Sequence, residues 1–323
     1  MQAIVMTRSG GTEVLELKDS PIPSPAAGQV QVRMHAAGIN FIDVYQRNGR
    51  YPVPMPYTPG LEGAGVVTAL GPNVTDVKVG ARVAFNGVPG AYAEYAIVDA
   101  EKLIPLPDKL SFVEGAAFPL QGMTAHYLLH EFRKVGPGTT VLIHAAAGGM
   151  GLLLTQWAKH VGATVFGTVS TPAKAALAKE AGADHVINYV EQDFVAETKR
   201  LTADRGIDLI IDGVGKTTFT KNLDAAALFG HIVIYGAASG VADPVAPNSL
   251  QAKSLTISGG TLFNFVATRP ALLMRSRAVL DGIQAGWLKL RAEHVLPLAE
   301  AGAAHALIES RASTGKIVLT MPQ

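Results

Sequence analysis

The sequence predicts an α/β protein with two domains, one mostly antiparallel β and the other built on a six-stranded, doubly wound parallel sheet. Its 323 residues exceed the ~150 residues that a single domain commonly needs. Short strands and turns fill the chain up to Gly122, and strands alternate with helical stretches after it. Such alternation is typical of βαβ units, in which helices cover a parallel sheet.

The composition excludes several classes of protein. With 48% hydrophobic and 16% charged residues, the chain is too apolar to be disordered. Its net charge is +1, and no polybasic run is present, so we expect no nucleic-acid partner. The sequence contains no cysteine, which excludes disulfides, a thiolate nucleophile and cysteine-ligated zinc.

One uncharged stretch, residues 141–158, is nearly long enough to cross a bilayer. The Gly148-Gly149 pair in its middle instead predicts a strand, a turn and a buried helix. The opening residues, MQAIVMTRSGG, lack the apolar core of a signal peptide. We therefore expect no association with a membrane and a cytoplasmic location.

The first region reads as antiparallel β structure. Residues 29–35 alternate apolar and polar side chains, as in a half-buried strand, and residues 79–85 and 93–98 continue the series. Residues 21–25 and 51–56 are rich in proline, which removes backbone donors, so we expect loops there. A mostly antiparallel barrel or sandwich is the prediction.

The second region contains six short β-branched runs: residues 141–144, 164–168, 185–188, 208–212, 231–235 and 255–258. One of the intervening helices should begin with Thr171 as N-cap and Pro172 in its first turn, and end at Gly182. Six strands match a complete dinucleotide-binding domain. The last residues lose this rhythm. We therefore predict a nucleotide domain over 125–262 and a first domain made of 1–124 and 263–323.

A glycine-rich loop joins the first of these strands to a helix. In the G-x-G-x-x-G frame its positions are Ala146, Gly148 and Gly151, with Gly149 and Met150 between them. The second position lets backbone approach a pyrophosphate, and the third lets the helix pack against the strand. The helix N-terminus adds unpaired N–H groups. A plain tight turn is the alternative.

The end of the second strand indicates which dinucleotide is bound. NAD-dependent enzymes usually carry an acidic residue there, but this chain has Ser170 and no acid. Lys174 lies in the first turn of the next helix, where the helix dipole disfavours a cation. An anionic 2′-phosphate would offset that cost, so we expect NADPH. The alternative is a solvated surface lysine.

Other catalytic motifs fail. Residues 213–217 resemble a P-loop end, but Ile210 occupies the required glycine position. None of the eight tyrosines is followed four residues later by lysine, and G-x-S-x-G is absent. His126 and His130 are one helical turn apart without a third ligand, so we interpret them as ordinary helix residues and expect no metal.

The chain resembles the zinc-independent quinone oxidoreductases of the medium-chain dehydrogenase/reductase superfamily. In zinc alcohol dehydrogenases a Gly-His-Glu triplet supplies a metal ligand, whereas this chain has Gly60-Leu61-Glu62. The resemblance covers essentially the whole sequence. It rests on residues 38–45, 59–65, 71–74, 144–149, 181–189 and 309–312.

The resemblance implies a GroES-like catalytic domain, formed by both chain ends, beside a Rossmann domain, with substrate entering between them. It also implies a homodimer through the edge strand near residues 255–260, and an unpaired edge invites such pairing. The residues that it places near the nicotinamide and the acceptor are Asn40, Asp43, Tyr45, Tyr51, Gln121 and Thr124.

Among these, Asn40 and Tyr45 are the residues we expect to position the acceptor. On the adenosine side the resemblance places Lys174 and Tyr189, and Gly236 lies where backbone passes the cofactor. Lys316 could reach the cofactor's phosphates or lie at the surface. The alternative role for Asn40 and Asp43 is capping of a turn, and for Tyr51 and Thr124 it is packing alone. Glu62 is interpreted as structural, because without a metal it lacks its usual local charge.

The function expected from the resemblance is NADPH-dependent reduction of quinones by metal-free transfer of a hydride or of electrons. A quinone is already electrophilic, so holding it against the nicotinamide requires no Lewis acid. One alternative is NADPH-dependent reduction of an activated carbon–carbon double bond, as in an enone, an enal or an enoyl thioester, with Tyr45 or Tyr51 as proton donor. Another is a nucleotide-binding structural or RNA-binding protein with little turnover.

Overall fold

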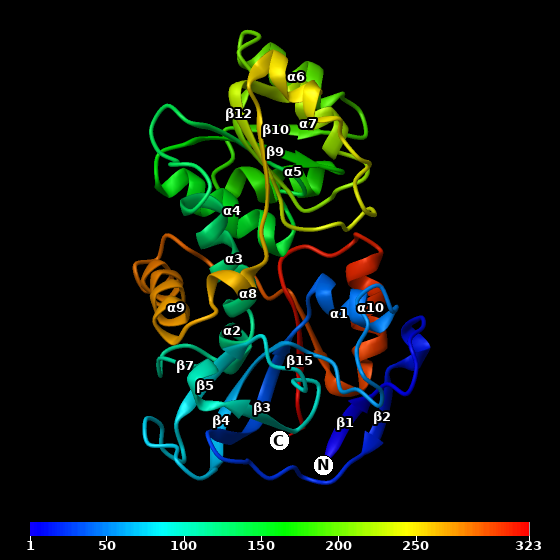
Figure 1. The fold of residues 1–323 in the computed structure, drawn as a ribbon, viewed down its shortest axis with the longest axis vertical. Coiled ribbons are helices and arrows are strands. Elements are labelled where there is room, and N and C mark those ends of the chain that lie inside the picture. Colours follow the sequence, from blue (N-terminus) through cyan, green and yellow to red (C-terminus); the bar gives the residue numbers. More distant parts are fainter. Residues whose placement is uncertain (323) are drawn as a thin grey trace. The chain divides into compact units, whose positions relative to one another are not determined.

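The computed structural model describes residues 1–322, which form two compact units (Figure 1). The first unit comprises residues 1–120, 266–277 and those from 290 onward, and the second comprises 121–265 and 278–289. No helix in the described part of the chain is long and apolar enough to cross a membrane.

The first unit is built on a seven-stranded sheet of order β14-β15-β3-β4-β5-β7, with β6 pairing β3. All its pairs are antiparallel except β14 with β15, which confirms the predicted mostly antiparallel region. A separate hairpin pairs β1 with β2. The strands are β1 (Gln2–Val5), β2 (Glu16–Asp19), β3 (Gln29–Gly38), β4 (Glu62–Leu70), β5 (Arg82–Asn86), β6 (Tyr95–Asp99), β7 (Leu103–Pro105), β14 (His294–Pro297) and β15 (Ile317–Thr320).

Strand β3 shows why this sheet forms. Val30, Val32 and Met34 are at most 1% exposed and share one face, as the alternating sequence predicts. The two ends of the chain meet beside it. In Figure 1 β15 lies against β3, and Val318 pairs with Gly38. This register places Lys316 next to the residues that follow β3.

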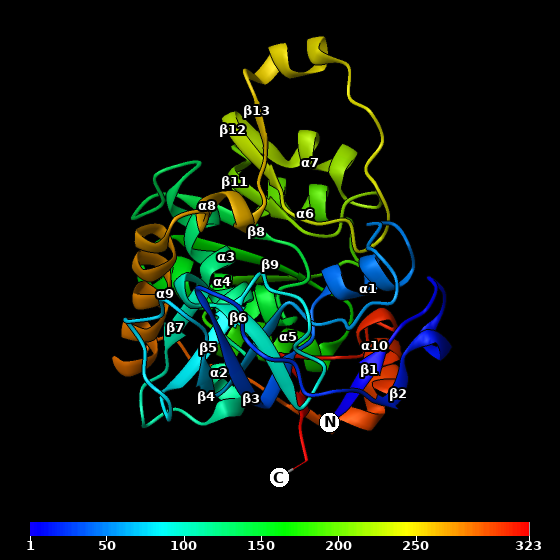
Figure 2. The ribbon, with the colours of Figure 1, turned by 60° about the horizontal axis from the view of Figure 1, so that its bottom comes forward.

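Helices α1 (Phe41–Arg47) and α10 (Ala301–Glu309) lie side by side in the first unit (Figure 2). Arg47 at the end of α1 donates two hydrogen bonds of 2.8 Å to the Glu309 carboxylate of α10. The first unit also contains the short helix α2 (Phe112–Gly115). Helix α9 (Arg269–Gln284) is longer and contributes residues to both units. Single 3-10 turns occur at Thr12–Val14, Ala100–Lys102 and Leu298–Glu300.

The second unit contains one parallel sheet of order β10-β9-β8-β11-β12-β13. This is the order of a complete doubly wound dinucleotide fold, so the predicted six-stranded domain is confirmed. Each of the six predicted runs lies in or overlaps one strand. The strands are β8 (Thr140–Ile143), β9 (Thr164–Val169), β10 (His185–Asn188), β11 (Ile207–Asp212), β12 (Ala226–Ile234) and β13 (Thr256–Gly259).

Helices pack on this sheet as the sequence predicts. Thr171 caps the N-terminus of α5, since its hydroxyl accepts a 3.2 Å hydrogen bond from the Lys174 N–H, and Gly182 follows the helix at φ +107°. Residues 141–158 form β8, a turn and most of α4, not a membrane span. The helices are α3 (Pro119–His130), α4 (Gly149–His160), α5 (Pro172–Glu180), α6 (Phe194–Leu201), α7 (Phe219–Ala225) and α8 (Leu262–Phe265), with a 3-10 stretch at Pro247–Lys253.

Strand β12 differs from its prediction, because it begins at Ala226 and not at residue 231. The β11–β12 pairing shifts register between Ile207 and Leu209, and Phe229 opposite has φ +59°. At this irregularity Leu228 and Phe229 are 60% and 64% exposed, so only the second half of the strand is continuously buried.

His126 and His130 stack on each other at 4.5 Å on α3. No group of three possible metal ligands exists among residues 1–322.

Candidate active site

Three buried polar side chains meet where β15, β4 and α1 converge in the first unit. Lys316 Nζ donates to Glu62 Oε2 at 2.6 Å and to Asn40 Oδ1 at 2.7 Å. Asn40 Nδ2 donates to the same Glu62 oxygen at 2.8 Å. Glu62 is 0% exposed and Lys316 3%, so each buried charge needs the opposite charge of the other to compensate for its lost hydration. The network therefore holds a buried ion pair against one predicted site residue, Asn40.

The surroundings of Glu62 fix this network further. Its second oxygen, Oε1, accepts a 2.6 Å hydrogen bond from the Leu120 N–H. A Cβ at Gly38 would lie 2.5 Å from Glu62 Oε2 and 2.2 Å from the Ala116 carbonyl oxygen, so only glycine fits there. The sequence interpretation of Glu62 as structural rested on the absence of a metal charge near it, and in the structure Lys316 supplies a positive charge there from the other end of the chain.

Asp43 joins the network from the first turn of α1. Its Oδ2 accepts hydrogen bonds from the Asn40 N–H at 2.8 Å and from the Tyr92 hydroxyl at 3.1 Å. Burial raises the pKa of Asp43 to about 7, although the Asn40 N–H, the Lys316 charge and the Tyr92 hydroxyl all act to lower it. The carboxyl group thus satisfies the N-terminus of α1, and its ionisation lies in the neutral range.

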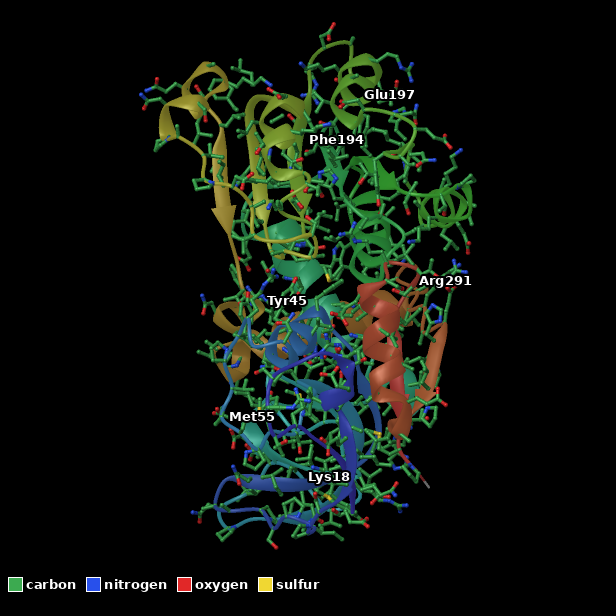
Figure 3. The ribbon with its side chains drawn as sticks, turned by 90° about the vertical axis from the view of Figure 1, so that its right-hand side faces the viewer. Lys18, Tyr45, Met55, Phe194, Glu197 and Arg291 are labelled. Atoms are coloured by element: carbon green, nitrogen blue, oxygen red, sulfur yellow. The ribbon has the colours of Figure 1, made fainter. Side chains whose placement is uncertain are left out.

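Two tyrosines, one on α1 and one in the loop that follows it, form a separate aromatic group. Tyr45 projects from α1 (Figure 3), and its ring meets that of Tyr51 edge-on at 5.3 Å. The Arg50 guanidinium lies 4.8 Å from the Tyr45 ring centre. Tyr45 is 8% exposed and Tyr51 49%, so Tyr51 presents an accessible aromatic face with a cation nearby.

In the second unit the glycine loop follows β8 and opens α4. Gly148 is the N-cap of α4, and no side chain caps this helix end in the part of the chain that is described. A Cβ at Gly151 would lie 2.3 Å from the Ala145 carbonyl oxygen, whereas one at Gly148 would meet only that atom, at 3.3 Å. The loop is therefore tight on the helix side and open at Gly148, which fits a dinucleotide pyrophosphate.

A buried polar network lies beneath this loop. His144 Nδ1 lies 3.0 Å from Thr168 Oγ1, and its Nε2 lies 2.8 Å from Asn222 Oδ1. Asn222 Nδ2 donates to Asp212 Oδ2 at 2.6 Å. Burial lowers the pKa of His144. The network ties the ends of β8, β9 and β11 together on both sides of the point where the strand order reverses.

The residues expected on the adenosine side follow the carboxyl ends of strands in the parallel sheet, or lie on the helix after one of them. Asn188 pairs with Val169, so Tyr189 and Ser170 follow adjacent strands, and the Tyr189 N–H donates to the Val169 carbonyl at 3.0 Å. Lys174 lies in the first turn of α5, and burial lowers its pKa. Gly236, after β12, packs so closely that a Cβ would lie 2.8 Å from the Gly213 carbonyl oxygen.

The predicted residues therefore fall into groups. Asn40, Asp43 and Lys316 share one network, and Tyr45 and Tyr51 form another. The second unit carries Gln121 and Thr124 on α3, and Thr124 is 5% exposed. Lys316 is not a surface residue, so that alternative is wrong, and its contact with cofactor phosphates stays a prediction. The dinucleotide group comprises Ala146, Gly148, Gly149, Met150, Gly151, Ser170, Lys174, Tyr189 and Gly236.

Sequence reasoning missed Arg47, Tyr92, His305 and the His144–Asn222 pair. His305 had one detectable signal, because it is the lone polar residue in the apolar run Ala-Gly-Ala-Ala-His-Ala-Leu-Ile. The others carry no local signal, since their partners are distant in the sequence.

Comparison with known families matches both units. Residues 26–108 match the family described as alcohol dehydrogenase GroES-like domain, and residues 149–276 match the zinc-binding dehydrogenase family.

Individual relatives align over nearly the whole chain. The chain is 42% identical to the 2-haloacrylate reductase of a Burkholderia species, covering 100% of this chain and 99% of the relative. It is 41% identical to the quinone oxidoreductase of Pseudomonas aeruginosa, covering 96% of each. The crystal structure of Escherichia coli quinone oxidoreductase complexed with NADPH superimposes with a TM-score of 0.96 at 38% identity, covering 99% of this chain and 100% of that one.

Proposed function

Because the chain belongs to the quinone oxidoreductase family of the medium-chain dehydrogenase/reductase superfamily, we propose that it reduces quinones with NADPH. The observation that carries this proposal is the full-length similarity to the E. coli quinone oxidoreductase, which was crystallised with NADPH. The open glycine loop at the N-terminus of α4 supports the same cofactor.

NADPH would be held in the second unit. Residues 146–151 would bind its pyrophosphate through backbone N–H groups at the helix end. Ser170, Lys174 and Tyr189 would meet the adenosine side, and the Lys174 charge would pair with the 2′-phosphate. When bound, NADPH supplies the hydride.

In the first unit, Tyr51, with the Tyr45 ring packed edge-on against it, would present an aromatic face to the acceptor, and Asn40 would help to position it. The residues' task is to orient the quinone ring and to exclude water from it. Reduction of the quinone to a hydroquinone requires the equivalent of one hydride, which NADPH would supply, and one proton, which solvent would supply. Hydrogen-bond donors near the acceptor oxygen would stabilise the negative charge that develops on it.

The test is NADPH oxidation, followed optically, with 1,4-benzoquinone, a naphthoquinone and a simple enone, and with NADH as the control donor. Turnover with the quinones and a preference for NADPH is the expected result. NADPH binding without turnover of any of these acceptors would overturn the assignment as a reductase of them.

A second candidate is reduction of an activated carbon–carbon double bond, favoured by the similarity to 2-haloacrylate reductase. The hydride would add to the β-carbon and a proton to the α-carbon, with Tyr45 or Tyr51 as proton donor. Turnover of the enone or of 2-chloroacrylate, without turnover of quinones, would select this function.

The quaternary structure that we propose is a homodimer formed by β13 edges, in a cytoplasmic protein. Strand β13 pairs with β12 on one side only, at the end of the sheet (Figure 2). An edge strand with unpaired N–H and C=O groups can pair with its copy in a second chain. Sedimentation velocity should give the mass of a dimer, and a monomer at micromolar concentration would contradict this.

A further inference from the structure

A chain of buried hydrogen bonds leads from Arg47 to Asp43 through two side chains outside the proposed catalytic set. Arg47 Nη1 lies 3.3 Å from His305 Nδ1, and His305 Nε2 lies 3.2 Å from the Tyr92 hydroxyl oxygen. That hydroxyl lies 3.1 Å from Asp43 Oδ2. Arg47 is 3% exposed and the other three are 0% exposed, so no solvent interrupts the chain.

The arginine at one end fixes the direction of every hydrogen bond. A guanidinium has only donors, so His305 Nδ1 must accept and its proton must lie on Nε2. That N–H donates to the Tyr92 oxygen, which leaves the Tyr92 O–H to donate to Asp43. Burial, followed by the Arg47 charge, lowers the pKa of His305 to about 3, so His305 is neutral near pH 7, as this arrangement requires.

The Arg47 end is fixed as well. Both terminal nitrogens donate to the Glu309 carboxylate at 2.8 Å, and Nε donates to the Gly10 carbonyl at 3.3 Å. Such a two-point ion pair holds the guanidinium in one orientation. The series of hydrogen bonds thus extends from the partly exposed Glu309 to the fully buried carboxyl group of Asp43.

At the other end Asp43 is poised between two protonation states. Its Oδ2 accepts from Tyr92 and from the Asn40 N–H, whereas its buried Oδ1 has no hydrogen-bond partner among the described residues. Oδ1 is therefore the atom that would carry the proton. The charged or titratable groups that shift the pKa of Asp43 are Lys316, Glu62 and Tyr92, with His305 and Arg47 behind Tyr92. Tyr57 is also near Asp43, but burial raises the pKa of Tyr57 to about 12, so Tyr57 is neutral near pH 7.

We propose that Tyr92 and His305 are positioning residues, which favour the ionised form of Asp43 and thereby hold Asn40 in place at the acceptor side. An ionised Asp43 accepts strongly from the Asn40 N–H, while Lys316 and Glu62 hold the Asn40 side chain. Protonation weakens the first of these contacts. Activity should therefore rise with pH as Asp43 ionises. The link to acceptor reduction rests on the proposed function.

A purely structural role makes a different prediction. If these hydrogen bonds only join α1, α10 and the segment around Tyr92, breaking them lowers the stability of the protein and leaves the pH dependence of the reaction unchanged. If it sets the charge of Asp43, the pH dependence itself must move.

The test compares Tyr92→Phe with the wild type across the pH range. Losing the O–H donated to Asp43 disfavours the carboxylate, so the acid limb of kcat/KM should move upward by about one pH unit. Near pH 6 the variant should be about tenfold slower than the wild type, and well above the limb the two should agree within about twofold. Tyr57→Phe is the matched control, since the Tyr57 hydroxyl bonds Gln46 and not Asp43. Its limb should not move.

A second pair of variants guards against simple loss of folding. Glutamine at position 305 can accept from Arg47 and donate to Tyr92, so His305→Gln should keep the wild-type limb. His305→Leu can do neither, and Tyr92 then loses the donor that polarises its O–H, so the limb should shift in the same direction as in Tyr92→Phe but by less. An unshifted limb in both Tyr92→Phe and His305→Leu, with a lowered Tm, would overturn the proposal.

An infrared titration separates this inference from the proposed function. The carboxyl band that disappears in Asp43→Asn reports the ionisation of Asp43 in the absence of any substrate. Its midpoint should rise by about one pH unit in Tyr92→Phe. An unchanged midpoint refutes the inference, whereas a raised midpoint in a protein that does not reduce quinones leaves the charge control intact and refutes the function alone.

Discussion

Lys316 and Glu62, which are 254 residues apart in the sequence, form a buried ion pair of 2.6 Å. The pair exists because β15 carries the C-terminal residues against β3, while β4 begins with Glu62 on the other side of β3. The pair places the positive charge of Lys316 in a fixed position beside Asn40.

Breaking this pair from one side should destabilise the protein strongly. Lys316→Met leaves the Glu62 charge buried and uncompensated, and we expect a loss of ~3–5 kcal/mol in the free energy of unfolding. The double variant Glu62→Gln/Lys316→Met should recover part of that loss. Urea denaturation measures both. Lys18→Ala, which breaks the exposed pair with Glu16, should have no measurable effect, and equal losses at the two sites would contradict this prediction.

The glycine loop offers a test of cofactor binding. In Gly151→Ala the new methyl group would lie 2.3 Å from the Ala145 carbonyl oxygen, so the loop or α4 must shift. We expect this overpacking to lower the free energy of unfolding by ~1–3 kcal/mol. We also expect it to raise the Kd for NADPH at least about tenfold, which a fluorescence titration measures. Gly136→Ala is the matched control, because its nearest atom would be 3.8 Å away. Similar affinities in the two variants would show that the loop does not hold the cofactor.

Discrimination between the two cofactors should depend on Lys174. In Lys174→Ala we expect the KM for NADPH to rise about tenfold or more while the KM for NADH stays nearly constant, because a hydrogen bond to a charged group contributes ~1.5–3 kcal/mol. Lys179→Ala, at the other end of α5, serves as the control. Steady-state kinetics with both donors decides, and an equal change for NADH and NADPH would argue against a contact with the 2′-phosphate.

The pH dependence of stability should reveal Asp43 and His305 separately. His305 has a folded pKa of about 3, below its ordinary value of 6.5, so its contribution to stability is lost as pH falls below 6.5. Asp43 has a folded pKa of about 7, above its ordinary value of 3.8, so its contribution is lost as pH rises from 3.8 to 7. Between 3.8 and 6.5 the two slopes oppose each other.

Removing either titratable group should therefore reveal the pH dependence of stability that the other group causes. In Asp43→Asn the free energy of unfolding should fall with acid by ~1.4 kcal/mol per pH unit in that window, relative to the wild type. In His305→Gln it should instead fall as pH rises, with a similar slope. Urea denaturation at several pH values measures this, and parallel curves for the wild type and both variants would contradict the two shifts.

Much of the fold could be predicted because its signals are local. The alternation in residues 29–35 predicted the core face of β3, and the β-branched runs predicted six parallel strands. The glycine loop was recognised because strand, turn and helix follow each other directly. The start of β12 was missed, since a register shift opposite Phe229 interrupts its pattern.

The sequence by itself determined the fold class and the strand–turn–helix of the glycine loop, since each depends on residue spacing within short segments, and its resemblance over the whole chain indicated the family. Only the tertiary structure decided the partners of Asn40, Asp43 and Lys316. Those partners come from strands and helices up to 276 residues away, joined by sheet register and helix packing. Hydrogen bonds between buried side chains depend on three-dimensional proximity, which no local spacing records.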